Sequence, residues 1–303
     1  MAISRAQLVK ELEPGLNALF GLEYDRYTNE TAEIFTTETS DRAFEEEVML
    51  SGFGGAATKA EGAAVTFDDA KEAFTARYTH QTVALAFAIT EEAIEDNLYD
   101  RLGNRYARAL ARSMANTKQV KGAEILNNAF SSSQLGGDGV VLCSTAHPTV
   151  SGTNLSNTFT TQADLSETSL ESALINIAAF IDERGLKISI QGTKLILPKE
   201  LQFTAERILK SPLRVGTADN DINAIANMNM IPEGYRVNHY LNDTNAWFIK
   251  TDTPNGFKHF VRAALRTAME GDFDTGNVRY KARERYSFGF SDPRCVYGSS
   301  GST

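Results

Sequence analysis

The chain is poor in the residues that build metal centres and disulfide frameworks. Its 303 residues include only two cysteines and four histidines. Two cysteines cannot form a disulfide framework, so free thiols in a reducing compartment are the simpler interpretation. The four histidines show no spacing that suggests a metal site. We therefore expect neither a metal nor another cofactor.

Long apolar runs are also missing. No segment approaches the roughly 18 consecutive apolar residues that indicate a membrane-spanning helix. Residues 1–5 lack the apolar core of a cleaved leader. From these two observations we expect a protein that is neither secreted through a leader nor inserted into a membrane.

Basic residues are the minority among the charged ones. Lysine and arginine total 30 against 39 acidic residues, which gives a net charge of −9 and a pI of about 5.1. This balance weighs against a dedicated nucleic-acid binder, whose phosphate contacts require a cationic surface. A hydrophobic content of 42% and a charged content of 23% are ordinary for a folded protein of one large or two modest domains.

The first part of the chain, residues 1–34, begins with an amphipathic stretch. Leu8, Leu12, Leu16 and Phe20 recur at helical spacing, but Pro14 and Gly15 interrupt them. We expect a helix of at most about four turns, followed by an extended arm. An ordinary N-terminal helix and an arm that reaches a neighbouring subunit are both compatible with this pattern.

Between residues 35 and 89 the period of the apolar residues changes from helical to alternating. Residues 44–50 alternate, residues 74–80 alternate after a loop, and residues 83–89 continue on the opposite parity. The intervening residues 51–62 are rich in glycine and alanine. We interpret the segment as a long hairpin with a flexible tip, too polar to pack a core of its own. It requires a partner surface, either on another subunit or on its own domain.

The strongest helix signal starts at Thr90. Thr90 is a suitable N-cap, and Glu91 and Glu92 favour the positive end of the helix dipole. Apolar residues follow at intervals of three or four as far as Phe130, which predicts a helix of about 40 residues and roughly 60 Å. Gly103 and Gly122 are the positions where we expect a bend or break.

Residues 166–254 predict a mixed unit of helices and strands. A helix is expected over 166–184 with Ser166 as its cap, and another over 201–209. Strands are expected over 194–198, 235–240 and 247–250. This succession indicates an α+β fold class.

A strand near the C-terminus carries one basic face. Arg279, Lys281, Arg283 and Arg285 share one parity, whereas the other parity is mostly apolar and includes Glu284. The basic face could bind phosphate, or it could pair with acidic surface on a neighbouring subunit, for which Glu45, Glu46 and Glu47 are candidates. We favour the second interpretation because the rest of the chain is acidic.

Cys143 and His147 are the only pair that suggests catalysis. A cysteine nucleophile requires a base and an orienting group in defined geometry. His147 precedes Pro148, so the segment is expected to be extended and the two side chains need not share a face. We favour a turn in which His147 hydrogen-bonds the backbone. A cysteine hydrolase remains the alternative from a different class.

Several short segments resemble one known family. They are Leu142-Cys-Ser-Thr-Ala-His-Pro148, the turn Gly152-Thr-Asn154, Ser211-Pro212, Asn220-Asp-Ile-Asn223 and Asp243–Phe248. Together with the order of the expected elements, they resemble the major capsid proteins of tailed bacteriophages with the HK-97-like fold, in particular the Mu-like major head subunits. The resemblance implies an N-terminal arm (1–34), an E-loop hairpin (35–89), a P domain with a long spine helix (90–165 and 255–303) and an A domain (166–254).

The resemblance also implies a function without enzymatic activity. The chain would assemble into pentamers and hexamers of an icosahedral shell around double-stranded DNA, without sequence-specific binding. The shell would belong to the virion and be assembled in the cytoplasm of the host bacterium. Scaffolding, portal and decoration proteins are possible further partners. An encapsulin-type compartment shell is the nearest alternative.

The same resemblance points to regions that contact other subunits. They are the hairpin tip Gly52–Gly62, which includes Gly54 and Lys59, the acidic residues Glu45, Glu46 and Glu47, the basic strand Arg279–Arg285, and the loop Arg214–Asn229. Some family members join subunits through a lysine near the position of Lys59. No matching asparagine or catalytic glutamate is identified in this chain, so we do not expect cross-linking.

Overall fold

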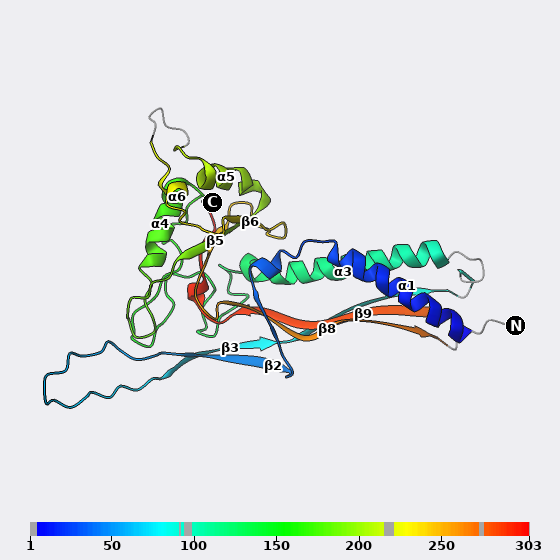
Figure 1. Ribbon diagram of the computed structural model, residues 1–303, viewed down its shortest axis with the longest axis horizontal. Helices are drawn as coiled ribbons and strands as arrows, with labels where there is room; N and C mark the ends of the chain where they lie inside the picture. Colours follow the sequence, from blue (N-terminus) through cyan, green and yellow to red (C-terminus); the bar gives the residue numbers. More distant parts are fainter. Residues whose placement is uncertain (1–4, 91, 94–98, 215–220, 273–275, 303) are drawn as a thin grey trace.

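The chain forms two lobes and a long projecting hairpin (Figure 1). The computed structural model describes residues 5–90, 92–93, 99–214, 221–272 and 276–302. The described strands form two four-stranded sheets and a two-stranded hairpin. This mixture of helices and sheets confirms the expected fold class.

The first lobe is built on a sheet whose strand order is β1-β8-β9-β4. The strands are β1 (Thr36–Thr39), β4 (Gln81–Ile89), β8 (Phe257–Gly271) and β9 (Val278–Phe290). In β9 the basic residues alternate with buried ones, which confirms the expected strand and its two faces. β8 and β9 pair antiparallel along nearly their whole lengths.

Two helices, α1 (Arg5–Asp25) and α3 (Tyr99–Asn127), cover one face of this sheet (Figure 1). The contact between the two helices and the sheet is apolar and includes Leu16 of α1, Leu110 of α3 and Tyr280 of β9. Thr90 caps as expected, because its Oγ1 accepts the N–H of Ala93 at 3.4 Å. The expected residues 94–98 of the long helix lie outside the described part of the chain.

The long helix continues through both of its glycines. At Gly122 a Cβ atom would lie 2.3 Å from Cγ2 of Thr31, so only glycine lets the N-terminal arm cross the helix there. The glycine allows close packing instead of the bend that helix propensity suggested.

The expectation of a short N-terminal helix was wrong. α1 is 21 residues long and contains Pro14 in its interior. An internal proline costs about 3 kcal/mol of helix stability. Pro14 lies on the exposed side, while Leu16 and Phe20 on the next turns are buried against α3 and β9. The tertiary packing therefore offsets the loss of one helical hydrogen bond.

The hairpin ends earlier than the sequence indicated, at Thr79 and not at residue 89. β2 (Phe44–Leu50) pairs only with β3 (Glu72–Thr79), whereas residues 81–89 form β4 and pair with β9. The change of parity after His80 marks the place where the chain leaves the hairpin. Phe87 of β4 packs beneath α3, which explains why this strand joins the first lobe.

The second lobe contains the sheet β10-β7-β5-β6 and three helices. Its strands are β5 (Gly192–Leu197), β6 (Tyr235–Val237), β7 (Trp247–Thr251) and β10 (Val296–Ser299), and its helices are α4 (Glu167–Ala178), α5 (Gln202–Lys210) and α6 (Ala224–Asn227). Short 3-10 turns occupy Thr31–Glu33, Lys199–Leu201 and Pro293–Cys295. Ser166 forms the expected N-cap of α4.

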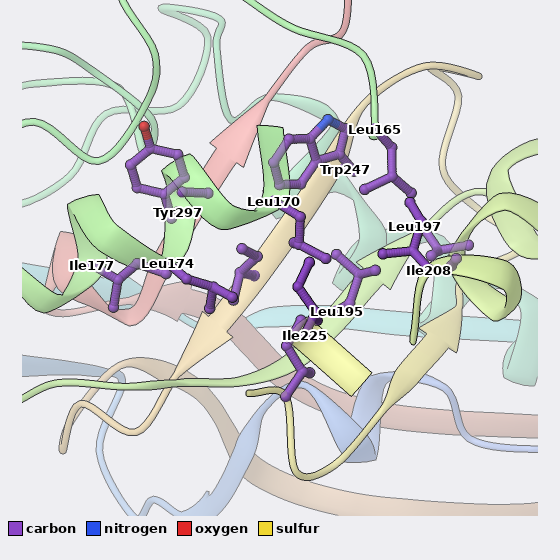
Figure 2. Packing of buried hydrophobic residues seen from close by; sticks show 14 of the residues in the cluster. Leu165, Leu170, Leu174, Ile177, Leu195, Leu197, Ile208, Ile225, Trp247 and Tyr297 are labelled. Carbon is purple, nitrogen blue, oxygen red and sulfur yellow. The ribbon is translucent and has the colours of Figure 1, made fainter. Parts of the chain in front are cut away.

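Trp247 and Leu195 lie at the centre of the second lobe, surrounded by the apolar faces of α4 and α5 (Figure 2). Tyr297 of β10 packs into the same core. The last strand of the chain therefore belongs to the second lobe, although residues 255–303 were assigned to a P domain by resemblance. The domain boundaries remain a prediction.

Candidate inter-subunit surfaces

The base of the hairpin is fixed to the first lobe through Glu47. Its carboxylate accepts a hydrogen bond from the hydroxyl of Ser291 and lies 3.3 Å from Nζ of Lys258. Ser291 also bonds the buried hydroxyl of Tyr78 at 2.5 Å. Burial opposes the charge of Lys258, but the hydrogen bonds that it donates to Glu38 and Glu47, with the negative charge of these carboxylates, outweigh burial and raise the pKa of this lysine.

Glu45 is also bound inside the subunit. Its carboxylate accepts the hydroxyl of Ser40 at 2.6 Å, and Ser40 Oγ lies 2.9 Å from Nε2 of His80. Because Ser40 donates to Glu45, His80 donates from Nε2 and accepts from Ser287 on Nδ1, at 3.0 Å. Burial, and then the charge of Arg285, lower the pKa of His80. The neutral imidazole thus links the hairpin to β9 at the point where β3 ends.

Glu46 has the opposite orientation from its two neighbours. It is exposed and lies 3.8 Å from Nε of Arg77, whose guanidinium stacks over the ring of Phe44. The strand therefore splits the three glutamates between its faces. Glu45 and Glu47 have partners within the subunit, and Glu46 is the one that faces outward. Their contact with a neighbouring subunit remains a prediction.

The far part of the hairpin is tied to the second lobe. The N–H of Gly54 donates to Asp68 at 2.7 Å, across the two arms of the hairpin. Nη2 of Arg184 then donates to both oxygens of Asp68, at 2.7 and 2.8 Å. A Cβ at Gly54 would lie 3.2 Å from Oδ2 of Asp68, so a larger residue would have to displace this carboxylate by a few tenths of an ångström. Lys59 is exposed farther along.

The hairpin also exposes large apolar side chains that the sequence analysis did not select. Phe67 is 97% exposed, and Phe53, Val65 and Leu50 are each more than half exposed. The available signal was the group of apolar residues 65 and 67 within a segment that we treated as a loop by composition. Apolar surface of this kind on a projecting element indicates a surface that contacts another protein.

The basic side chains of β9 alternate with Tyr280 and Ala282, which pack against α1 and α3, so they lie on the opposite face of the first sheet. Lys281 and Arg283 are exposed, and no residue of the described part of the chain forms an ion pair with either. Arg283 stands directly opposite Arg266 of β8 in the pairing register. Like charges in this position destabilise a sheet unless an anion lies between them.

The remaining two members of the basic strand differ from this pair. Arg279 pairs with Asp272 at the end of the sheet. The side chain of Arg285 is half-buried, and its Nε atom is buried without a hydrogen-bond partner among the described residues. The accessible positive charge therefore lies at the middle of the strand.

Arg214 is tied to the N-terminal end of α4 in the second lobe. Its Nε lies 3.0 Å from Glu167 at the start of α4. Leu213 and Ile222 form an isolated bridge beside it, and both are exposed. Residues 215–220 of the expected contact loop lie outside the described part of the chain.

Cys143 and His147 do not form the pair that a hydrolase requires. The thiol of Cys143 is buried, and burial raises its pKa. His147 binds the carboxylate of Asp138 through Nδ1 at 2.6 Å, and its Nε2 has no partner in the described structure. A thiol held protonated, without a hydrogen-bonded base, is a poor nucleophile. The expected turn was wrong, because His147 pairs with Leu155 in an isolated bridge and its ring bonds a carboxylate and not the backbone.

One buried ion pair joins the hairpin side of the molecule to the second lobe, and sequence reasoning missed it. Nη2 of Arg294 lies 2.7 Å from Glu183, and its Nη1 lies 3.1 Å from Asp292. The guanidinium also approaches Met49 of β2. Asp292 is two residues from Arg294, but Glu183 and Met49 are far from it in sequence, so no spacing rule could have brought them together.

The described residues contain no cluster of three or more histidine, cysteine or acidic side chains that could hold a metal ion. Among the helices that the structure describes, none has the length and apolar character needed to cross a membrane.

Comparison with solved structures places the fold among shell proteins. The capsid subunit of an empty GTA particle matches with a TM-score of 0.54 and 14% identity, over 89% of this chain and 88% of that one. The procapsid of bacteriophage JBD30 matches with a TM-score of 0.54 and 14% identity, over 99% and 77%. A virus-like particle from Pyrococcus furiosus gives 0.50 and 12%, over 94% and 97%. At these identities the likeness concerns the fold.

The two lobes and the projecting hairpin define a shell-forming structural protein with the HK-97-like fold. No curated protein matches the chain. A family model described as phage capsid protein matches residues 71–299. The chain therefore belongs to the phage capsid protein family and is a major capsid protein, as the resemblance implied.

Proposed function

We propose that this chain is the major head subunit of a tailed bacteriophage and that it forms the pentamers and hexamers of an icosahedral shell around double-stranded DNA. The observation that supports this best is the family match over residues 71–299. The shell belongs to the virion and is assembled in the cytoplasm of the bacterial host. Its function then depends on contacts between subunits, without catalysis.

The structure supports a role for the hairpin in those contacts. Its base is fixed to the first sheet through Glu47 and Tyr78, while its far part carries exposed apolar residues such as Phe67. A rigid base and an apolar end allow a projecting element to bind a second subunit at low entropic cost. We assign the hairpin as the E-loop that overlaps an adjacent subunit.

We also propose that the accessible cations of the first sheet, Lys281 and Arg283, contact a neighbouring subunit. Their direct neighbours on the sheet are alanines and Arg266, so the face has an unbalanced positive charge. The rest of the chain is acidic, with a net charge of −9. Packaged DNA would be the other anion available to this face, without sequence-specific contacts.

An encapsulin-type shell is the alternative, and a virus-like particle is among the structures that this fold resembles. The fold does not separate the two, whereas the family match favours the phage head. Scaffolding, portal and decoration proteins are further partners within this proposal.

The decisive experiment is electron microscopy of the expressed protein, with light scattering on the same sample after size-exclusion chromatography. Closed shells, or rings of five and six subunits, are expected. A compact monomer or dimer that never assembles at high concentration or high salt would contradict the proposal. The diameter of the shells separates a large phage head from a small compartment.

A second experiment tests the charged face. The double substitution Lys281→Glu with Arg283→Glu reverses both charges. It should abolish shell formation, while the circular dichroism spectrum and the thermal unfolding temperature remain close to those of wild type. The control Lys199→Glu with Arg207→Glu makes the same change in net charge on exposed positions of the second lobe. Normal shells in the first variant would exclude the contact.

A further inference from the structure

The outer edge of the first sheet is an unprotected strand. β4 is the last strand in the order β1-β8-β9-β4 and, within the described residues, it pairs with β9 alone. Its pairing runs from Gln81 to Ile89 without a bulge. One side of its backbone therefore presents a row of free N–H and C=O groups.

The sequence of β4 lacks every device that usually protects such an edge. Natural edge strands carry lysine, proline, bulges or inward-pointing charges that prevent pairing with another chain. The nine residues of β4, Gln-Thr-Val-Ala-Leu-Ala-Phe-Ala-Ile, include no charged residue and no proline. At one end of the strand Lys121 binds the side chain of Gln81, at 2.6 Å, and among the described residues no other strand pairs with this edge.

The side chains of β4 are open as well. Leu85 is 46% exposed, and Thr82, Ala84 and Ala86 are exposed on the opposite face. α3 packs against only one face of the strand. A long, regular, uncharged and exposed edge strand is a template for an additional strand.

We propose that β4 receives a strand from a second copy of this chain, and that the strand is β2 of its hairpin. The inference rests on the proposed shell function, because the occupant is another subunit. It adds that the hairpin binds through main-chain hydrogen bonds along the sheet edge. A contact between different surfaces of successive copies repeats around an axis, and it closes a ring where the rotation between copies is a whole fraction of a turn.

The charge of the two strands supports this choice. Ala84, Ala86 and Ala88 of β4 stand directly opposite Arg283, Lys281 and Arg279 of β9 and share their face. A strand beside β4 therefore meets a row of cations at short range. β2 contains three consecutive glutamates, and because side chains alternate, at least one carboxylate lies on the basic face in either orientation.

The exposure of β2 agrees with this arrangement. Its outward face carries Phe44, Glu46, Val48 and Leu50, and in the described part of the chain Glu46 pairs with Arg77 alone, at 3.8 Å. β2 pairs with β3 on one side, so its other edge is free within the described residues. The inward contacts of Glu45 and Glu47 can persist when Glu46 meets the cations of the neighbouring copy.

Photo-cross-linking in assembled shells tests the inference. A benzophenone amino acid replaces Leu85, and shells are formed from an equal mixture of isotope-labelled and unlabelled protein so that contacts between copies are identified by mass spectrometry. The expected result is a mixed-label cross-link to residues 44–50 that is absent from unassembled protein. The same amino acid at Leu22, which is exposed on α1, is the control and should not reach residues 44–50.

Amide exchange of the wild-type protein provides a second readout that needs no substitution. The amides of residues 81–89 that face the free edge should exchange at least about tenfold more slowly in shells than in unassembled protein. Shells with unchanged exchange, or with cross-links to other segments, would overturn the inference and leave the shell function intact. If no shell forms under any condition, both the inference and the proposed function fail.

Discussion

Arg184 binds both carboxylate oxygens of Asp68 through its Nη2 atom, at 2.7 and 2.8 Å, and so ties the far arm of the hairpin to the second lobe of the same subunit. This contact connects segments that no other described strand pairing joins. The hairpin is therefore held at two places, at its base by Glu47 and farther out by Asp68.

Substitution Arg184→Ala should release the far arm of the hairpin without unfolding the protein. The pair is partly exposed, so its loss should change the free energy of unfolding little. Trypsin should cleave after Lys59 and Lys71 faster than in wild type. The control Lys210→Ala removes another exposed pair, with Glu206, and should leave the rate of this cleavage unchanged.

The same contact should be lost in acid. The hydrogen bond from the Gly54 backbone, followed by the bonds from Arg184, lowers the pKa of Asp68 below its ordinary value of 3.8. A lowered pKa means that the contact is complete above pH 3.8 and is lost as the pH falls through the folded-state pKa. Cleavage of wild type by an acid-active protease should therefore accelerate only below that pH, and in Arg184→Ala it should already be fast above it.

The elements that the sequence predicted well are those decided by local patterns. Ser166 caps α4 because its oxygen accepts the N–H of Ser169, three residues away. The two faces of β9 follow from strict alternation. These contacts require no knowledge of distant parts of the chain.

The elements that it missed depend on partners far away in sequence. Residues 81–89 read as part of the hairpin because their true partner is β9, near the other end of the chain. From sequence, Glu47 is expected to be free to contact a neighbouring subunit because its partners, Lys258 and Ser291, are distant in sequence. Glu45 is expected to be free in the same way, although its partner Ser40 is only five residues away. The helix through Pro14 depends on burial of Phe20 under α3, which outweighs the local signal to stop.

Arg294 should be among the residues most important for stability. Its guanidinium is buried between Glu183 and Asp292, at 2.7 and 3.1 Å. Substitution Arg294→Ala leaves two buried carboxylates without their counter-ion and should lower the free energy of unfolding by about 3–5 kcal/mol. Urea denaturation measures this difference. Lys199→Ala, which breaks an exposed pair, should change it by less than about 1 kcal/mol, and an equal effect of the two substitutions would contradict the buried pair.

Gly137 and Gly21 should respond to alanine in opposite directions. A Cβ at Gly137 would lie 2.8 Å from the backbone of Thr75 and Ala76, so Gly137→Ala must displace β3. We expect a loss of about 1–3 kcal/mol in the free energy of unfolding, and faster amide exchange in β3. A Cβ at Gly21 of α1 meets no atom within 4 Å. Gly21→Ala should therefore stabilise the protein, by at most about 1 kcal/mol.

His259 should make the stability of the first lobe depend on pH. Its ring is stacked on Phe288 with centroids 4.3 Å apart, and its Nδ1 lies 3.2 Å from Oγ1 of Thr37. Burial, and then the charge of Lys118, lower the pKa of His259 from 6.5 to about 4. The folded state therefore keeps the imidazole neutral at pH values where the unfolded chain has already bound a proton.

Between pH 6.5 and 4 the imidazole of His259 binds a proton in the unfolded chain but not in the folded one. The contribution of His259 to the free energy of unfolding therefore falls as the pH decreases through that window. The contribution of this histidine is roughly 3 kcal/mol in total. His259→Phe preserves the stacked ring and removes the titration, so its stability should fall less steeply than that of wild type. Urea denaturation at several pH values across the window compares the two slopes. Parallel slopes would show that other groups cause the acid sensitivity, since the substitution leaves every other titratable residue in place.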